Sequence, residues 1–181
     1  MKTQGDFAGA RNNLSKFYIQ VSQSIRFWQP KIFLNLQYSG GLGVTEPKRY
    51  SYYINNTFAT GISYPFKWSN TYFTGQLSYQ VTFYEKPSQD MICTLYWWKS
   101  LFNYRAEFAG DFSAWTANKN QGDTFTSNLS GKRFYFFAEP QAWYNINKWF
   151  GVGTKMNMYY HINTSANLFE VYPTLAVRCK L

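Results

Sequence analysis

The chain has 181 residues, enough for one domain, and we treat residues 1–181 as a single unit. Aromatic residues make up 22% of it, charged residues only 15%, and the formal net charge is +9. The sequence contains no run of about 18 apolar residues, which excludes a transmembrane helix. Its basic residues are scattered along the chain, which argues against a nucleic-acid partner.

Alternation of apolar and polar residues is the strongest pattern. From Phe17 to Phe27, apolar residues at odd positions alternate with mostly polar ones at even positions. The same period of two predicts nine strands, at 16–27, 31–38, 52–62, 72–84, 91–98, 105–112, 134–143, 150–161 and 169–180. Most are long enough to cross a bilayer when tilted, which takes about 9 to 11 residues. We therefore predict an all-β fold, a transmembrane antiparallel up-and-down β-barrel of about 10 to 12 strands when closed.

Short and longer connections alternate between these segments. The short ones are at 29–30, 65–70, 102–103 and 146–148, and the longer, polar ones at 40–49, 86–90, 116–132 and 163–167. Outer-membrane barrels have short periplasmic turns and longer outer loops, so segment 116–132 is predicted to be extracellular. Six tryptophans flank the short turns and predict an interfacial girdle: Trp28, Trp68, Trp97, Trp98, Trp143 and Trp149.

The N-terminal end leaves two possibilities open. Bacterial barrels have an even number of strands, so nine strands require a partner. Residues 2–10 supply a short tenth strand, or an N-terminal piece is missing. Residues 1–6 lack the apolar core of a signal peptide, so we expect a signal that was removed or a sequence cut from a longer precursor.

Polar and aromatic residues on the inward-facing parity predict the lining of a lumen. The candidates are Tyr18, Arg26, Tyr53, Tyr96, Arg105, Glu107, Asp111, Tyr135, Phe137, Glu139, Lys155 and Glu170. Three acidic residues on neighbouring strands are expected beside Lys155, either as a solute-orienting constriction or as an ion-pair network that fills a narrow barrel. Twelve strands favour the constriction and ten favour the network. The inward rings either stack on nucleobases or sugars or fill space.

Catalytic and metal chemistry have little support. His161 is the only histidine, without a neighbouring cysteine or acidic partner, so no metal site is predicted. No nucleophile-elbow, phosphate-loop or zinc-protease motif occurs, no cofactor is implied, and a hydrolase that uses His161 with Ser127 or Ser165 is strongly disfavoured. The two cysteines fall on the apolar parity and are expected to be small lipid-facing residues.

The last third of the chain resembles a known group of proteins. The segments are Phe-Phe-Ala-Glu-Pro-Gln-Ala-Trp-Tyr-Asn-Ile-Asn at 136–147, Val-Gly-Thr-Lys at 152–155 and Tyr-Pro-Thr-Leu-Ala-Val-Arg at 172–178. They resemble a family of outer-membrane barrels of unassigned function from Bacteroidetes-type bacteria, which is similar to the Tsx-type nucleoside-specific channels. The resemblance covers the chain from about residue 5 onward. It implies a twelve-stranded barrel and passage of nucleosides.

Three functional hypotheses follow. The first is an integral outer-membrane channel for small polar solutes, with outer-membrane lipid and a nucleoside as partners. The second is a non-conducting structural or partner-binding barrel, a subunit of a larger outer-membrane assembly. The third, a soluble lipocalin-like binder, is disfavoured because its lumen would be apolar and its outer face wet.

Overall fold

The computed structural model describes the backbone of residues 2–8, 13–28, 31–44, 51–162 and 165–179, and the side chains of 17–28, 31–42, 54–162 and 165–179. In this part of the chain all regular structure is extended, and no helix has the length and apolarity to cross a membrane. The strands are β1 (Lys2–Ala8), β2 (Asn13–Trp28), β3 (Ile32–Val44), β4 (Ser51–Trp68), β5 (Thr71–Thr82), β6 (Ser88–Leu101), β7 (Ala106–Asn118), β8 (Lys132–Ala138), β9 (Gln141–Asn145), β10 (Phe150–Tyr160) and β11 (Phe169–Cys179).

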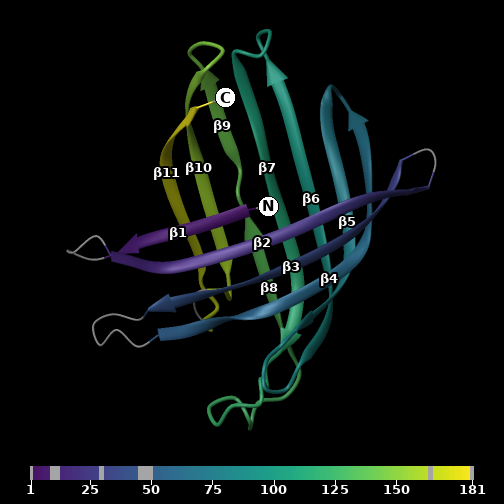
Figure 1. Cartoon of the computed structure of the whole chain (residues 1–181), viewed down its shortest axis with the longest axis vertical. Helices are drawn as coiled ribbons and strands as arrows, with labels where there is room; N and C mark the ends of the chain where they lie inside the picture. The colour runs from purple at the N-terminus through teal and green to yellow at the C-terminus, as the bar shows by residue number, and fades with distance from the viewer. Residues whose placement is uncertain (1, 9–12, 29–30, 45–50, 163–164, 180–181) are drawn as a thin grey trace.

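All strands belong to one antiparallel, up-and-down sheet. Each strand pairs with the next in the chain, except that β8 and β9 share one position between β7 and β10. The described strands therefore occupy ten positions, and the N-terminal segment supplies the short tenth strand as β1. The sheet curls strongly, so that β2, β3 and β4 cross in front of β6 to β10 at a steep angle (Figure 1). The described ladders run from β1 to β11, and none of them joins these two strands.

Pro140 explains why one predicted strand is divided. The sequence pattern predicts a single strand over 134–143, but the ladder is interrupted at Glu139 and Pro140 because proline has no backbone N–H to donate. Both halves keep the same register against β7 and β10. The Glu139 amide donates to the carbonyl of Asp111 (2.8 Å), and the Met156 amide to that of Pro140 (3.0 Å). The two halves therefore occupy one strand position between β7 and β10.

Several strands are longer than the sequence pattern predicts. β4 continues through Trp68, so the turn predicted over 65–70 is reduced to Ser69 and Asn70, both with positive φ as a two-residue hairpin requires. β3 continues to Val44, so the loop predicted to begin at Gly40 is wrong there. Its glycines mark a register shift between Ser39 and Gly41. The predicted 102–103 turn is confirmed, and the predicted 29–30 turn lies outside the described residues.

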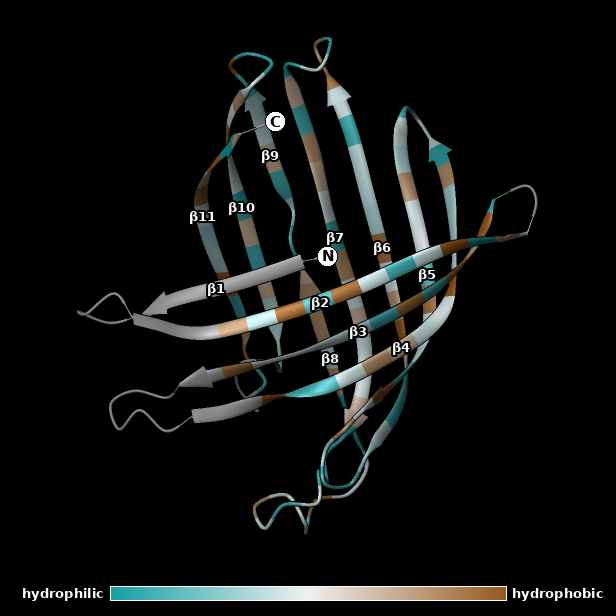
Figure 2. Cartoon of the chain, in the orientation of Figure 1, coloured by the Kyte–Doolittle hydropathy of each residue, from teal (hydrophilic) through white to brown (hydrophobic). Residues whose placement is uncertain are grey.

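The burial pattern is the reverse of that of a water-soluble domain. Buried side chains of the described residues are mostly polar, such as Asn35, Ser78 and Gln80, whereas large apolar side chains such as Ile62, Leu77 and Met91 are exposed. Figure 2 shows the hydrophilic and hydrophobic bands alternating along the strands. The predicted alternation is thus confirmed, with the polar parity on the inner face of the curled sheet and the apolar parity on the outer face.

The tryptophans beside the short turns only partly follow the girdle prediction. Trp28, Trp68 and Trp149 are exposed there, as predicted. Trp143 is 7% exposed and points to the inner face, so its assignment to the girdle is wrong. Trp143 shares its parity with Glu139 and Gln141 and therefore lies on the inner face, where its ring packs against the Arg178 guanidinium.

Candidate functional site

The inner face of β7 to β11 holds a ladder of polar and aromatic side chains. We call the end of the sheet with the Ser69–Asn70 hairpin and the 102–105 turn the turn end, and the end with segments 83–87 and 119–131 the loop end. Side chains two residues apart on one strand share a face, and antiparallel register aligns them with their neighbours across strands. The levels of this ladder follow one another from the turn end to the loop end.

At the turn end, Arg178 of β11 forms an ion pair with Glu107 of β7 across the two intervening strands, β9 and β10. Its Nη2 lies 3.0 Å from Oε2 of Glu107 and donates to Oδ1 of Asn145, also at 3.0 Å. Asn145 Nδ2 donates to Glu107 Oε1 (2.7 Å), so both carboxylate oxygens are engaged. The guanidinium carbon lies 4.6 Å from the centroid of the Trp143 ring, a cation–π contact. Glu107 is thus a buried, paired anion.

One level higher, Lys155 of β10 pairs with Glu139. Its Nζ lies 3.2 Å from Glu139 Oε1, which also accepts a hydrogen bond from Gln141 Nε2 (2.6 Å). Trp143 Nε1 donates to Gln141 Oε1 (3.0 Å) and links this level to the one below. The two ion pairs therefore form one connected network along β9.

Three aromatic rings lie above the Lys155 level. Phe137 of β8, Tyr159 of β10 and Tyr172 of β11 form a row with ring centroids 5.5 and 5.9 Å apart, and the planes are inclined by 39° and 57°. The Tyr172 hydroxyl donates to Glu170 Oε1 (2.9 Å). The other oxygen of that carboxylate, Oε2, and Oδ1 of Asn157 are buried without a hydrogen-bond partner.

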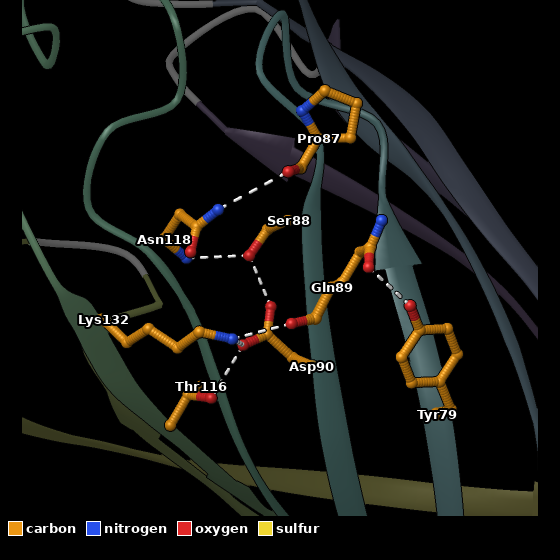
Figure 3. A network of polar contacts seen from close by, with 8 residues as sticks. All are labelled: Tyr79, Pro87, Ser88, Gln89, Asp90, Thr116, Asn118 and Lys132. Carbon is orange, nitrogen blue, oxygen red and sulfur yellow. Dashed lines mark hydrogen bonds and ion pairs between the residues drawn. The ribbon is translucent and has the colours of Figure 1, made fainter.

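A second polar network closes the loop end of β6, β7 and β8. Asp90 accepts from Lys132 Nζ (2.6 Å) and Thr116 Oγ1 (2.8 Å) through Oδ1, and from the Ser88 hydroxyl through Oδ2. Figure 3 shows these donors converging on Asp90 from β6, β7 and β8. The backbone amide of Asn118 donates to the same Ser88 oxygen (2.8 Å). With its carboxylate buried and engaged on both oxygens, Asp90 ties the base of the 119–131 segment to the sheet.

The 119–131 segment has its own internal order. Asp123 accepts from the amides of Phe125 (2.8 Å) and Thr126 (2.9 Å) and from the Thr126 hydroxyl (2.7 Å). The Thr126 hydroxyl bond, chiefly, lowers the pKa of the Asp123 carboxyl. The segment docks on the neighbouring loop through the Lys86 amide, which donates to the carbonyl of Gln121 (2.8 Å). In that neighbouring loop, burial chiefly raises the pKa of Tyr84 to about 12, with the nearby Tyr135 and Asp90 also raising it.

Both ring nitrogens of His161 lie within hydrogen-bond distance of oxygen atoms of neighbouring residues. Its Nδ1 lies 2.7 Å from the carbonyl oxygen of Phe134, and its Nε2 lies 2.8 Å from Asn167 Oδ1. The described residues contain no cluster of three or more metal-ligating side chains. Cys93 and Cys179 are free and exposed on the apolar parity.

The structure brings together some of the residues predicted to line a lumen. Glu139 and Lys155 form an ion pair, but Glu107 pairs with Arg178, so the acidic group expected around Lys155 is divided. Arg105 lies in the 102–105 turn just before β7, with an exposed side chain. The other candidates lie as follows: Tyr18 and Arg26 on β2, Tyr96 paired in register with Asp111, and Tyr135 stacked on Trp115. Phe137 belongs to the aromatic row, whose last member, Tyr172, bonds to Glu170. The side chain of Tyr53 lies outside the described residues.

Sequence reasoning missed the residues that complete these networks. Asn145, Trp143 and Ser88 each make a key contact, yet Asn145 and Trp143 read as turn-flanking residues and Ser88 as part of a loop. Their inward parity was the available signal, because they share it with Glu139 and Asp90. Which anion each cation pairs with depends on the register of strands far apart in sequence, and alternation alone does not give that register.

The comparisons with known proteins give a family and no function. A family model described as a domain of unknown function (DUF5020) matches residues 5–181. The chain belongs to this family. No curated protein and no solved structure matches it. The match spans β2 to β11 and most of β1, and so includes both inner-face ion pairs and the Asp90 network.

Proposed function

We propose that this chain is a β-barrel of the bacterial outer membrane that passes small polar solutes, with nucleosides as the first class to test. The observation that carries the membrane assignment is the reversed burial. Of the described residues, eleven polar side chains are buried against five apolar ones, while the large apolar side chains cover the outer face. Such a continuous apolar surface is unfavourable in water and is stable when lipid covers it.

The inner face supports solute passage by its chemistry. The row of Phe137, Tyr159 and Tyr172 offers flat apolar rings, and the Glu139–Lys155 pair below it offers both a donor and an acceptor. A nucleoside has a planar base that stacks on aromatic rings and a sugar with hydroxyl groups that bond to charged side chains. The inner face thus provides both kinds of contact on adjacent levels.

A non-conducting barrel is the second candidate, and one observation favours it. The described strands occupy ten positions rather than twelve, and small barrels fill their interior with side chains. Glu107, Glu139 and Asp90 are all paired with cations on the inner face. A filled interior of this kind fits an anchor or a subunit of a larger outer-membrane assembly.

The membrane assignment is tested by a matched pair of arginine substitutions on β5. Leu77 lies on the outer face and is 48% exposed, and Gln76 beside it belongs to the inner face. Near the middle of a bilayer, Leu77→Arg costs about 2 to 4 kcal/mol of folding free energy. On a half-exposed site in water the same change would cost little. We expect Leu77→Arg to destabilise the protein folded in phospholipid vesicles and Gln76→Arg to be tolerated; equal stability of both variants would refute membrane burial.

Solute passage is tested by planar-bilayer conductance of the refolded protein. Its folding is verified first by the heat-dependent shift of its gel band. We expect steady conductance that nucleosides reduce at lower concentrations than simple sugars do. Tyr159→Leu should weaken this block, and Tyr144→Leu, on the exposed outer face, should leave it unchanged. A folded protein without conductance would refute the channel and make the non-conducting barrel the leading hypothesis.

A further inference from the structure

Two hydrogen-bond acceptors on the inner face of β10 and β11 lack a donor. Glu170 Oε2 and Asn157 Oδ1 are both buried and without a partner. Asn157 pairs in register with Tyr172, and Tyr159 with Glu170, so the two acceptors are diagonal neighbours on one face. Buried polar atoms of folded proteins are nearly always satisfied, and a carboxylate oxygen is among the costliest to leave alone.

The surrounding charges do not supply the missing partner. Asp90, Glu139 and Glu107 form ion pairs with Lys132, Lys155 and Arg178, and Glu170 takes part in none of these. Lys155 lies on the same face of β10 as Asn157, but it forms its ion pair with Glu139. The Tyr172 hydroxyl satisfies only Oε1 of Glu170. The Glu170 carboxylate on the inner face of β11 therefore has one oxygen, Oε2, without a hydrogen-bond donor.

The aromatic row lies beside this charge, because Tyr159 is opposite Glu170 in register and Tyr172 donates to it. The rings of Phe137, Tyr159 and Tyr172 are tilted against one another by 39° and 57°, so together they present faces in several directions rather than one flat slot. Ring faces carry partial negative charge and attract ammonium groups, most strongly where water is excluded. Tyr172 is 48% exposed on the inner face, and Glu170 is the second residue of β11, so both lie in the half of the sheet nearer the loop end.

We propose that Glu170, Asn157 and the three rings form a binding site for an organic cation, a solute that carries an alkylammonium group. The carboxylate supplies the opposite charge, the rings cover the alkyl groups, and the Asn157 carbonyl accepts from any N–H or O–H that the solute carries. The site goes beyond the proposed function, because nucleosides carry no alkylammonium group, and it rests on that function only in that solutes must reach the inner face.

The test uses choline and its uncharged isostere 3,3-dimethylbutan-1-ol. Both are titrated by calorimetry into the whole refolded chain in detergent micelles. Choline should bind saturably at one site, and the isostere at least tenfold more weakly, because it lacks the charge that the carboxylate and rings recognise. Glu170→Gln keeps the shape of the side chain and removes its charge, and should weaken choline binding by roughly tenfold. Glu85→Gln, the same change in the exposed 83–87 loop, should leave binding unchanged.

A second variant separates the rings from the carboxylate. Tyr172→Phe retains the ring and should keep most of the affinity, whereas Tyr172→Leu should lose about threefold to tenfold. The proposal is overturned if choline does not saturate, if the isostere binds equally well, or if Glu170→Gln leaves the affinity unchanged in a protein that still shows the heat-dependent gel shift. Choline binding without conductance would refute only the channel, and conductance without choline binding would refute only the cation site.

Discussion

Replacing Arg178 by methionine removes the cation that neutralises Glu107 at the turn end. Methionine keeps the length and apolar stem of the side chain, so the change tests charge more than packing. The carboxylate it leaves behind is buried and keeps the donation from Asn145 Nδ2 at 2.7 Å, but it loses its cation. We therefore expect a clear loss of stability that does not depend on any solute.

The magnitude follows from burial on each side of the pair. Removing one partner of a fully buried ion pair costs about 3 to 5 kcal/mol. Arg178 is 28% exposed and Asn145 continues to donate, so about 2 to 3 kcal/mol is expected for Arg178→Met. Glu107→Gln should cost about 1 kcal/mol, since the guanidinium keeps the Trp143 ring and some water. The double variant should lose less than the sum of the two, with a coupling energy of about 2 kcal/mol.

The assay is urea unfolding in phospholipid vesicles followed by tryptophan fluorescence. Arg105→Met serves as the matched control, because Arg105 is exposed in the 102–105 turn and its loss should change stability by less than about 0.5 kcal/mol. Equal effects of Arg178→Met and Arg105→Met would refute the reasoning. Strict additivity in the double variant would also refute it, since the pair would then contribute nothing as a pair.

Three further outcomes are expected. Asp90→Asn should make the 119–131 segment cleavable by added protease while the strands stay protected, because the carboxylate holds Lys132 and two hydroxyl groups at its base; an unchanged cleavage rate would contradict this. The pKa of Asp123 is lower in the folded protein than its ordinary value of 3.8. The hydrogen bonds of its carboxylate should therefore stabilise the 119–131 segment above pH 3.8, and this stabilisation should be lost as the pH falls through the lowered pKa. Amide exchange of the segment across a pH series checks this. Gly61→Ala should lower the urea midpoint strongly, since its Cβ would lie 2.2 Å from a backbone oxygen, whereas Gly75→Ala meets nothing within 4 Å and should be neutral.

The sequence predicted the fold class and the inward parity because both depend on a local repeat. Side chains alternate across any strand, so Phe58 and Ile62 must face away from Ala59 and Ser63 whatever the partner strand is. The strand ends were predicted less well. The sequence predicts Gly40 and Gly41 at the start of a longer loop, whereas in the structure they accommodate a register shift inside β3.

The candidate site was only half predictable for the same reason. Glu139, Lys155, Tyr135 and Glu107 were placed on the inner face by alternation alone. Which residues touch was decided by register, which sets Arg178 opposite Gly151 and Glu107 opposite Trp143. The paired residues are far apart in the chain, and no local sequence pattern encodes the register that brings them together.

By itself, therefore, the sequence determined an antiparallel sheet with a polar inner and an apolar outer face, because a period of two is a property of each strand alone. Only the tertiary structure decided that the described strands occupy ten positions, that Pro140 divides one of them, and that Arg178 neutralises Glu107. It also placed Glu170 beside Tyr159 and Tyr172 with one oxygen unpaired. These features depend on how strands distant in sequence align, and that alignment is set by the whole sheet at once.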